Sequence, residues 1–240
     1  MKIYFDRQIY IYYDEREELK DKICNDQREG HVFLYSPAHI EEIALDAASG
    51  NEHRLENELN KIIKITNQFS FVSQDHIKCR IILDKVHSCL SRVRDNNGLS
   101  ETERAKSMQK QMSMHLVGLV DKKIKRILSH KKYDEIFSFK DIKKEAEDNL
   151  NKYKKYESNF SERRNLIAML FMILEKYGWK QSSDPKKAGN NMHDVTHAIY
   201  ASYGDIFVTN DQRLKDLSKA VFMFMGLKTE VIYYPEYLTW

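Results

Sequence analysis

Short apolar runs alternate with amphipathic stretches at both ends of this chain. Residues 2–5, 31–35, 206–209 and 229–234 are rich in the β-branched and aromatic residue types that favour strands. Residues 9–13 share this composition, and we expect the first of the two N-terminal runs to be a central strand. Helical patterns follow at 14–29, 37–48 and 211–225, the second of them with Ser36 as N-cap and Pro37 at the first helical position. This order predicts an α/β domain with a parallel sheet.

The middle of the chain has a different pattern. From residue 51 to 180 strand signals fade and apolar residues recur at helical spacing, as at Ile77, Ile81 and Leu83. A turn at 95–98 interrupts the pattern, and a polar break at 181–191 ends it. We therefore expect residues 1–50 and 181–240 to form the α/β core, and 51–180 to be a helical insertion that packs on or over it.

Composition narrows the class of protein. The chain has 240 residues, 42% hydrophobic and 31% charged, and no run of about 20 apolar residues that would span a bilayer. Asp6 interrupts the N-terminal apolar run where a signal peptide needs an apolar core, so a cytoplasmic location is expected. Cys24, Cys79 and Cys89 are odd in number and widely spaced, which indicates reduced, buried thiols and neither a disulfide framework nor a zinc site.

The net charge is only +3, so it does not by itself indicate a nucleic-acid partner. Lysine and arginine residues are nevertheless concentrated between residues 122 and 155. This basic middle is suited to phosphate contacts, and it is equally suited to a solvated helix surface interleaved with acids. Both interpretations stay open on sequence alone.

Two aspartates follow predicted strands. Asp6 ends the first apolar run, and Asp211 follows the run 206–209. Because parallel strands deliver their carboxyl ends to the edge of the sheet that surrounds the ligand crevice, we expect both side chains there. Asp205 precedes the second strand and should lie at the opposite edge. The alternatives are that Asp6 only starts a turn and that Thr209, Asn210 and Asp211 only cap the next helix.

Two predicted helices add further acids. Ser36, His39 and Glu42 are spaced three apart and share a helix face, so Glu42 is preferred to Glu41 as a site residue. Asp194 opens a helix in which His197 lies one turn later, and small residues beyond it allow a close approach to the sheet. Asp194 is otherwise an N-cap and His197 a buried structural imidazole. Several carboxylates brought together are the ligands that Mg²⁺ or Mn²⁺ prefers.

These residues together resemble the PIN-like domain family of nucleases. The resemblance covers about 50 residues at the start and 60 at the end, and residues 51–180 depart from the compact family pattern. It implies a Rossmann-like three-layer fold, Mg²⁺ or Mn²⁺ held by Asp6, Glu42, Asp194 and Asp211, and hydrolysis of RNA, with a toxin or phage-defence role among the expected settings. Thr209 and Asn210 would support the ligands, and Ser36, His39 and His197 would contact them or the substrate. Single-stranded RNA, which Tyr200 and Tyr203 would help to bind, is the expected partner, with a homo-oligomer or a regulatory protein as further expected partners.

Two other functions stay open. His193-Asp194 is the dipeptide of helical HD-type metal-dependent phosphohydrolases, in which His76, His87 or His115 would complete the site. The apolar strands at both ends argue against an all-helical fold. The second alternative is a non-catalytic interaction or scaffold module, in which the acids only cap helices and the helical middle is the partner surface.

Overall fold

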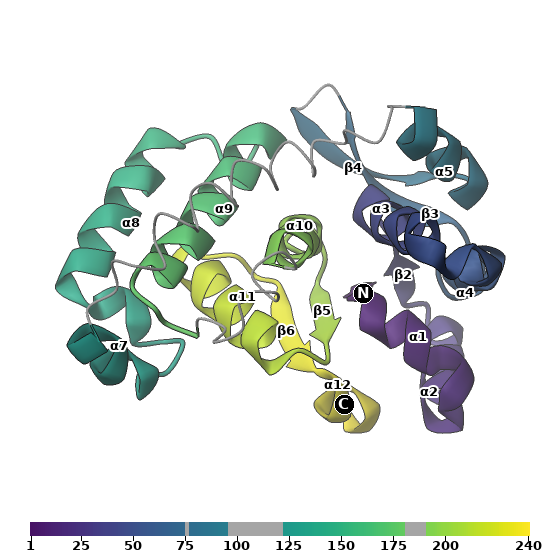
Figure 1. The fold of residues 1–240 in the computed structure, drawn as a ribbon, viewed down its shortest axis with the longest axis horizontal. Coiled ribbons are helices and arrows are strands. Elements are labelled where there is room, and N and C mark those ends of the chain that lie inside the picture. Colours follow the sequence, from purple (N-terminus) through teal and green to yellow (C-terminus); the bar gives the residue numbers. More distant parts are fainter. Residues whose placement is uncertain (75–76, 96–121, 181–190) are drawn as a thin grey trace.

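Four parallel strands form the central sheet of the computed structural model, which describes residues 1–74, 77–95, 122–180 and 191–240 (Figure 1). The strands are β1 (Lys2–Phe5), β2 (Val32–Leu34), β5 (Ile206–Thr209) and β6 (Glu230–Tyr233), in the order β2-β1-β5-β6. Ile3 is paired with Phe33 on one side and with Ile206 on the other, so β1 is interior, as predicted. The chain runs from β1 to β2 and later returns to the other side of β1. The carboxyl ends of β1 and β5 therefore flank the topological switch point, where ligands bind in open α/β sheets.

Helices and a small second sheet occupy the rest of the described chain. Their bounds are α1 (Arg7–Glu15), α2 (Glu17–Arg28), α3 (Pro37–Asp46), α4 (Leu55–Thr66), β3 (Phe69–Gln74), β4 (Lys78–Leu83), α5 (Val86–Asp95), α7 (Lys122–Ser129), α8 (Lys140–Lys152), α9 (Phe160–Lys176), α10 (Asn191–Ala201), α11 (Gln212–Phe224) and α12 (Tyr234–Thr239). A π-helical turn (Ala47–Asn51) and a 3-10 turn (Glu52–Arg54) join α3 to α4, and a second 3-10 turn (Ile136–Ser138) precedes α8.

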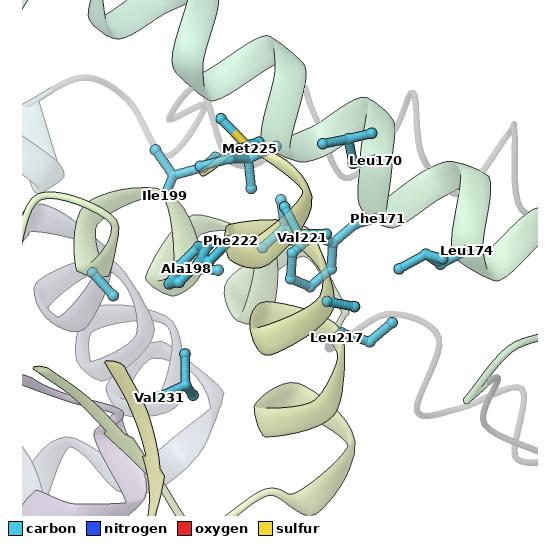
Figure 2. Close-up of a cluster of buried hydrophobic side chains, with 14 of the residues drawn as sticks. Leu170, Phe171, Leu174, Ala198, Ile199, Leu217, Val221, Phe222, Met225 and Val231 are labelled. Atoms are coloured by element: carbon cyan, nitrogen blue, oxygen red, sulfur yellow. The ribbon is translucent and has the colours of Figure 1, made fainter. Parts of the chain in front are cut away.

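The sheet is buried on both faces. Ile3 and Phe5 of β1 belong to one hydrophobic cluster with residues of α1, α2, α3, α4, α5 and α12, whereas Tyr4 belongs to a second cluster. The second cluster is formed mainly by α8, α9, α10 and α11, and Figure 2 shows Leu174, Ala198 and Leu217 among its side chains. Side chains that alternate between two apolar layers indicate a sheet enclosed between helices. The α/β class and the parallel sheet are thus confirmed.

The prediction of strand character for residues 9–13 is wrong, because this segment lies in α1. Ile9, Tyr10 and Tyr13 are its buried residues, which is the one-sided pattern of a helix that packs on a sheet. The β-branched and aromatic composition is explained by burial against the sheet and not by strand pairing. The predicted helix 14–29 is mainly α2, and Gly30 follows it with a φ of +82°.

The prediction of helical structure around Ile81 and Leu83, within the largely helical region 51–180, is also wrong. Strands β3 and β4 form an antiparallel hairpin inside it, with Phe69 opposite Leu83 and Phe71 opposite Ile81. The hairpin continues from the main sheet through a parallel bridge between Tyr35 and Ser70. The helix α4 also packs in the same hydrophobic cluster as β1. Helices α7, α8 and α9 fit the predicted helical character.

Several predictions concern residues outside the described ranges. These are most of the turn at 95–98, the polar break at 181–190 and the apolar residues between 100 and 121. Within the described chain, no helix is both long and apolar enough to cross a membrane. The three cysteines are free thiols, but the prediction that they are buried is confirmed only for Cys89, because Cys24 is exposed and Cys79 is partly exposed.

Candidate functional site

Thr209 joins the two strand-end aspartates. The Asp6 amide donates to the carbonyl of Val208 at 2.9 Å, which holds the end of β1 against β5. The Thr209 hydroxyl donates to Oδ2 of Asp6 at 2.9 Å and accepts from the Asp211 amide at 3.0 Å. Asp6 is buried and Thr209 is fully buried. The predicted placement of Asp6 and Asp211 at the carboxyl edge of neighbouring strands is therefore observed.

Asp211 is also the N-cap of α11. Its Oδ1 accepts hydrogen bonds from the amides of Arg213 at 2.7 Å and Leu214 at 3.0 Å. This is the capping role that the sequence left open. Both of these capping hydrogen bonds use the same carboxylate oxygen of Asp211.

Glu42 extends from α3 to two histidines of α10. Its Oε1 lies 3.1 Å from Nε2 of His197 and 3.2 Å from Nδ1 of His193. Burial opposes ionisation of Glu42, but the two histidines lower its pKa to about 2. Burial would lower the pKa of His197, yet the Glu42 carboxylate raises it overall. The preferred acid of α3, Glu42, thus contacts α10 through both histidines.

A buried polar network lies behind Glu42. The Tyr4 hydroxyl is 2.8 Å from Nδ1 of His197 and 2.6 Å from the Ser36 hydroxyl. His39 donates from Nε2 to the carbonyl of Phe5 at 2.8 Å and accepts the Ser36 amide on Nδ1 at 3.1 Å. Burial, reinforced by the charge of His197, lowers the pKa of His39 to about 3, so His39 is neutral. His39 and His197 are thus satisfied buried imidazoles that position α3 and α10.

Asp194 lies in the first turn of α10, three residues after its start, and is therefore not the helix N-cap. Burial raises its pKa to about 8, and the charges of Asp6, Asp211 and Glu42 act in the same direction. Arg213 opposes this shift, since its Nη1 donates to Oδ2 of Asp194 at 3.2 Å. The four predicted acids consequently lie within electrostatic reach of one another. Protonation or a cation relieves their mutual repulsion.

The four carboxylates do not form a closed ligand set. In the part of the chain that the structure describes, the group of three metal-binding side chains with all ligand atoms within 4.8 Å of one another is Asp26, Glu29 and His31. That group precedes β2, at the opposite edge of the sheet, and Asp26 already pairs with Lys22 at 2.7 Å. At the switch point, Arg213 instead pairs with Asp194, and His193 and His197 pair with Glu42.

An all-oxygen donor set fits a hard divalent cation. Asp6 has one oxygen bonded to Thr209, Asp211 has one bonded to backbone amides, and Asp194 has one bonded to Arg213. For Asp194 and Asp211 these hydrogen bonds use one carboxylate oxygen each, whereas Asp6 also accepts a hydrogen bond from the Arg7 backbone amide. Their combined charge, which is strong enough to raise the pKa of Asp194, gives the physical reason for a cation at this place.

Sequence reasoning did not find Arg213 and Arg7, and it considered His193 only for the HD-type alternative and not as a partner of Glu42. Arg213 also pairs with Oε1 of Glu175 at 2.5 Å and donates to the carbonyl of Lys180 at 2.7 Å. A cation in the first turn of a helix is unfavourable by the helix dipole, and this was the signal available for Arg213. Arg7, directly after Asp6, pairs with Glu58 at 2.8 Å and Asp46 at 3.0 Å.

The remaining predicted contacts lie away from the acids or have structural partners. Asn210 donates to the Tyr12 hydroxyl at 2.9 Å. Tyr200 and Tyr203 pack against Phe160 in the hydrophobic cluster of α9 and α10, which favours their alternative role as core residues. Asp205 accepts the Lys2 amide at 2.7 Å, at the amino edge as expected. Of the histidines considered for an HD-type site, His87 pairs with Glu56, and His76 and His115 lie outside the described residues.

No protein-family model matches this chain, and comparison with curated proteins and with solved structures finds no match.

Proposed function

We propose that this protein is a divalent-metal-dependent nuclease that hydrolyses phosphodiester bonds of single-stranded RNA. The observation that supports this function best is the gathering of Asp6, Glu42, Asp194 and Asp211 at the switch point of the parallel sheet. Four acids from two strand ends and two helices, close enough to shift one another's pKa, are more than helix capping requires. Perturbed carboxylates of this kind concentrate at functional sites.

The four acids would hold Mg²⁺ or Mn²⁺ through the oxygens that the protein does not use. Such an ion lowers the pKa of an attacking water and stabilises charge on the phosphate. Hydrolysis forms a bond from the water oxygen to phosphorus and breaks the bond from phosphorus to the leaving oxygen. Glu42, which the histidines keep ionised despite its burial, is placed to ligate or to orient the water.

Other residues of the chain position these acids. Thr209 fixes the rotamer of Asp6 and the start of the Asp211 loop. His197 contacts Glu42 through Nε2, and its Nδ1 is hydrogen-bonded to the Tyr4 hydroxyl. Such supporting hydrogen bonds orient ligands in metal sites. Arg213 pairs with Asp194 and is placed to contact the substrate phosphate once a cation takes over that carboxylate.

The arrangement is compatible with the PIN-like fold that the sequence resembles, and we extend the proposal to that fold and to a toxin or phage-defence role. A cytoplasmic location and a homo-oligomeric or regulatory partner belong to the same proposal.

The basic residues of α8, including Lys143 and Lys144, are exposed and would contact the RNA backbone.

A non-catalytic interaction module is the second candidate. It is favoured by the fact that each acid already has a protein partner: Asp6 has Thr209, Glu42 has the histidines, Asp194 has Arg213, and Asp211 has the α11 amides. In this case the acids only hold the core together, and the surface of the helical region binds a partner.

The decisive experiment incubates the full chain with labelled single-stranded RNA and DNA in Mn²⁺, in Mg²⁺ or in EDTA. Asp6→Asn and Asp194→Asn are compared with Asp205→Asn, which makes the same change at the opposite edge of the sheet. Metal-dependent cleavage that both site variants lose and Asp205→Asn retains is expected. Absence of cleavage by the parent protein would favour the interaction module, and equal cleavage by the folded Asp6→Asn variant would exclude the four acids as the catalytic site.

A further inference from the structure

A cation–aromatic stack lies at the same edge of the sheet as the acids. Tyr12 of α1 and Tyr234, the first residue of α12, have ring centroids 5.5 Å apart. The Arg16 guanidinium carbon lies 4.8 Å from the centroid of Tyr12 and 5.4 Å from that of Tyr234. Arg16 is thus placed over two rings that come from the segments following β1 and β6.

The outer face of Arg16 is open to a ligand. Its side chain is 45% exposed, and the ion pair found for it, with Glu18, spans 4.0 Å between groups that are both exposed. Ion pairs between exposed side chains contribute little free energy, so Glu18 restrains the Arg16 guanidinium only weakly. The two rings restrain the side chain from one side, so a planar cation is presented to solvent with little freedom left to lose on binding.

Asn210 connects this stack to the acids. Its side-chain amide donates to the Tyr12 hydroxyl at 2.9 Å. The preceding residue, Thr209, donates to Asp6, and the next residue, Asp211, caps α11 beside Asp194. Side chains of consecutive residues in an extended segment point to opposite sides, so the acids and the stack flank one loop.

We propose that Arg16, supported by Tyr12 and Tyr234, is a stacking subsite for an unpaired nucleobase next to the phosphate held at the acids. This inference rests on the proposed nuclease function and deepens it, because it supplies a reason for selecting single strands. Guanidinium planes and aromatic rings stack on bases whatever their sequence, but only on bases released from a duplex.

The test measures fluorescence anisotropy of a labelled single-stranded RNA in EDTA, so that binding is observed without cleavage. Arg16→Ala is expected to weaken binding about tenfold, a typical loss for one stacking contact. Arg16→Lys retains the charge but not the plane, so it is expected to show most of this loss. Arg28→Ala, an exposed arginine of α2 near the opposite edge of the sheet, is the matched control and should bind within about twofold of the parent protein, since it lacks the stack.

Three results would overturn the subsite. They are parent-like binding by Arg16→Ala, full recovery by Arg16→Lys, which indicates a phosphate contact, and absence of RNA binding by the parent protein. An oligonucleotide with abasic positions should bind the parent about as weakly as intact RNA binds Arg16→Ala. Thermal unfolding of each variant checks that the fold is retained.

Cleavage assays on the same variants separate the two proposals. Cleavage that depends on Asp6 while Arg16→Ala binds normally overturns only the subsite. Binding that depends on Arg16 in a protein that cleaves nothing in Mn²⁺ overturns only the nuclease.

Discussion

Arg213 on α11 donates a hydrogen bond from Nη1 to Oδ2 of Asp194 on α10, over 3.2 Å. The same guanidinium pairs with Glu175 on α9. One partly buried arginine therefore links three helices on one face of the sheet and supplies a positive charge where the acids gather. Any divalent cation held by Asp194 has to share this carboxylate with Arg213 or replace it.

Removing this arginine should destabilise the fold. Arg213→Ala leaves Asp194 and Glu175 largely buried without their cation, and breaking a buried pair typically costs about 3 to 5 kcal/mol. Because the arginine side chain is 18% exposed, we expect a value at or below the lower end, about 2 to 3 kcal/mol, from urea unfolding.

Arg94→Ala is the control for this prediction. Arg94 pairs with Glu52 on the surface, where both side chains are about half exposed or more, so the change should cost under about 1 kcal/mol. Added Mg²⁺ should recover part of the stability that Arg213→Ala loses and none of any loss in Arg94→Ala. Equal losses of unfolding free energy in the two variants would show that the ion pairs of Arg213 stabilise the fold no more than an exposed surface pair does.

The hydroxyl of Tyr4 should matter more than that of Tyr10. Tyr4→Phe removes the partner of Ser36 and of His197, both buried, and leaving such groups unsatisfied costs about 1 to 3 kcal/mol. The Tyr10 hydroxyl is buried with no hydrogen-bond partner among described residues, so Tyr10→Phe should be neutral or stabilising. Chemical denaturation of both variants tests this, and a larger loss in Tyr10→Phe would contradict the network.

The contribution of Asp194 to stability should fall as pH rises from about 4 to about 8, whereas that of His39, whose pKa is lowered to about 3, should rise up to about pH 6.5. Burial raises the pKa of Asp194 to about 8 in the folded protein, above its ordinary value of 3.8, so the native state binds this proton more tightly than the unfolded chain. Between the two values the unfolded chain binds fewer protons, and the stability lost with rising pH follows from that difference. The raised pKa of His197 acts in the same direction.

Asp194→Asn isolates this contribution. The variant should be about as stable as the parent near pH 4 and more stable at pH 8, since it has no carboxylate to ionise there. Urea midpoints at pH 4, 6 and 8 provide the measurement. Parallel pH profiles for parent and variant would mean that Asp194 is ionised without strain.

The cluster in Figure 2 should be sensitive to cavities. Leu217 of α11 is fully buried in it, and Leu→Ala at such a site costs about 2 to 5 kcal/mol. Met223 lies on the same helix with 59% of its surface exposed, so Met223→Ala should cost under about 0.5 kcal/mol. Similar unfolding midpoints for the two variants would contradict the packing of α11 against α9.

The sequence predicted the elements whose local signals agree with their tertiary setting. Ser36-Pro37 marks the start of α3, and the apolar run ending at Thr209 is β5. Glycine and proline residues at the ends of elements and a short buried run are sufficient to predict these elements, because local propensity and burial favour the same structure. For the same reason Asp6 and Asp211 were placed at the correct edge.

Two elements were mistaken because burial and pairing are not local. Ile9, Tyr10 and Tyr13 look like strand residues, but they are one buried face of α1. Ile81 and Leu83 follow a helical spacing, yet they pair with Phe71 and Phe69 across a hairpin. The bridge between Tyr35 and Ser70 attaches this hairpin to the sheet. The hydrophobic periodicity of the sequence does not predict that these two residues lie close together.

The candidate site was predicted as a set of acids, without their counter-charges. Arg213 and His193 contact Asp194 and Glu42 only because α10, α11 and α3 meet at one edge of the sheet. Contacts between helices distant in sequence depend on the packing of the sheet and not on spacing along the chain.

Binding of Mn²⁺ to the full chain, followed by electron paramagnetic resonance of the free ion, tests the central claim most directly. The acids at the switch point predict saturable binding that Asp6→Asn weakens about tenfold or more and that Asp205→Asn leaves unchanged. Glu29→Gln, in the acid and histidine group at the opposite edge, should also bind as the parent does. Binding that is absent from the parent, or lost in Glu29→Gln and kept in Asp6→Asn, would contradict the account.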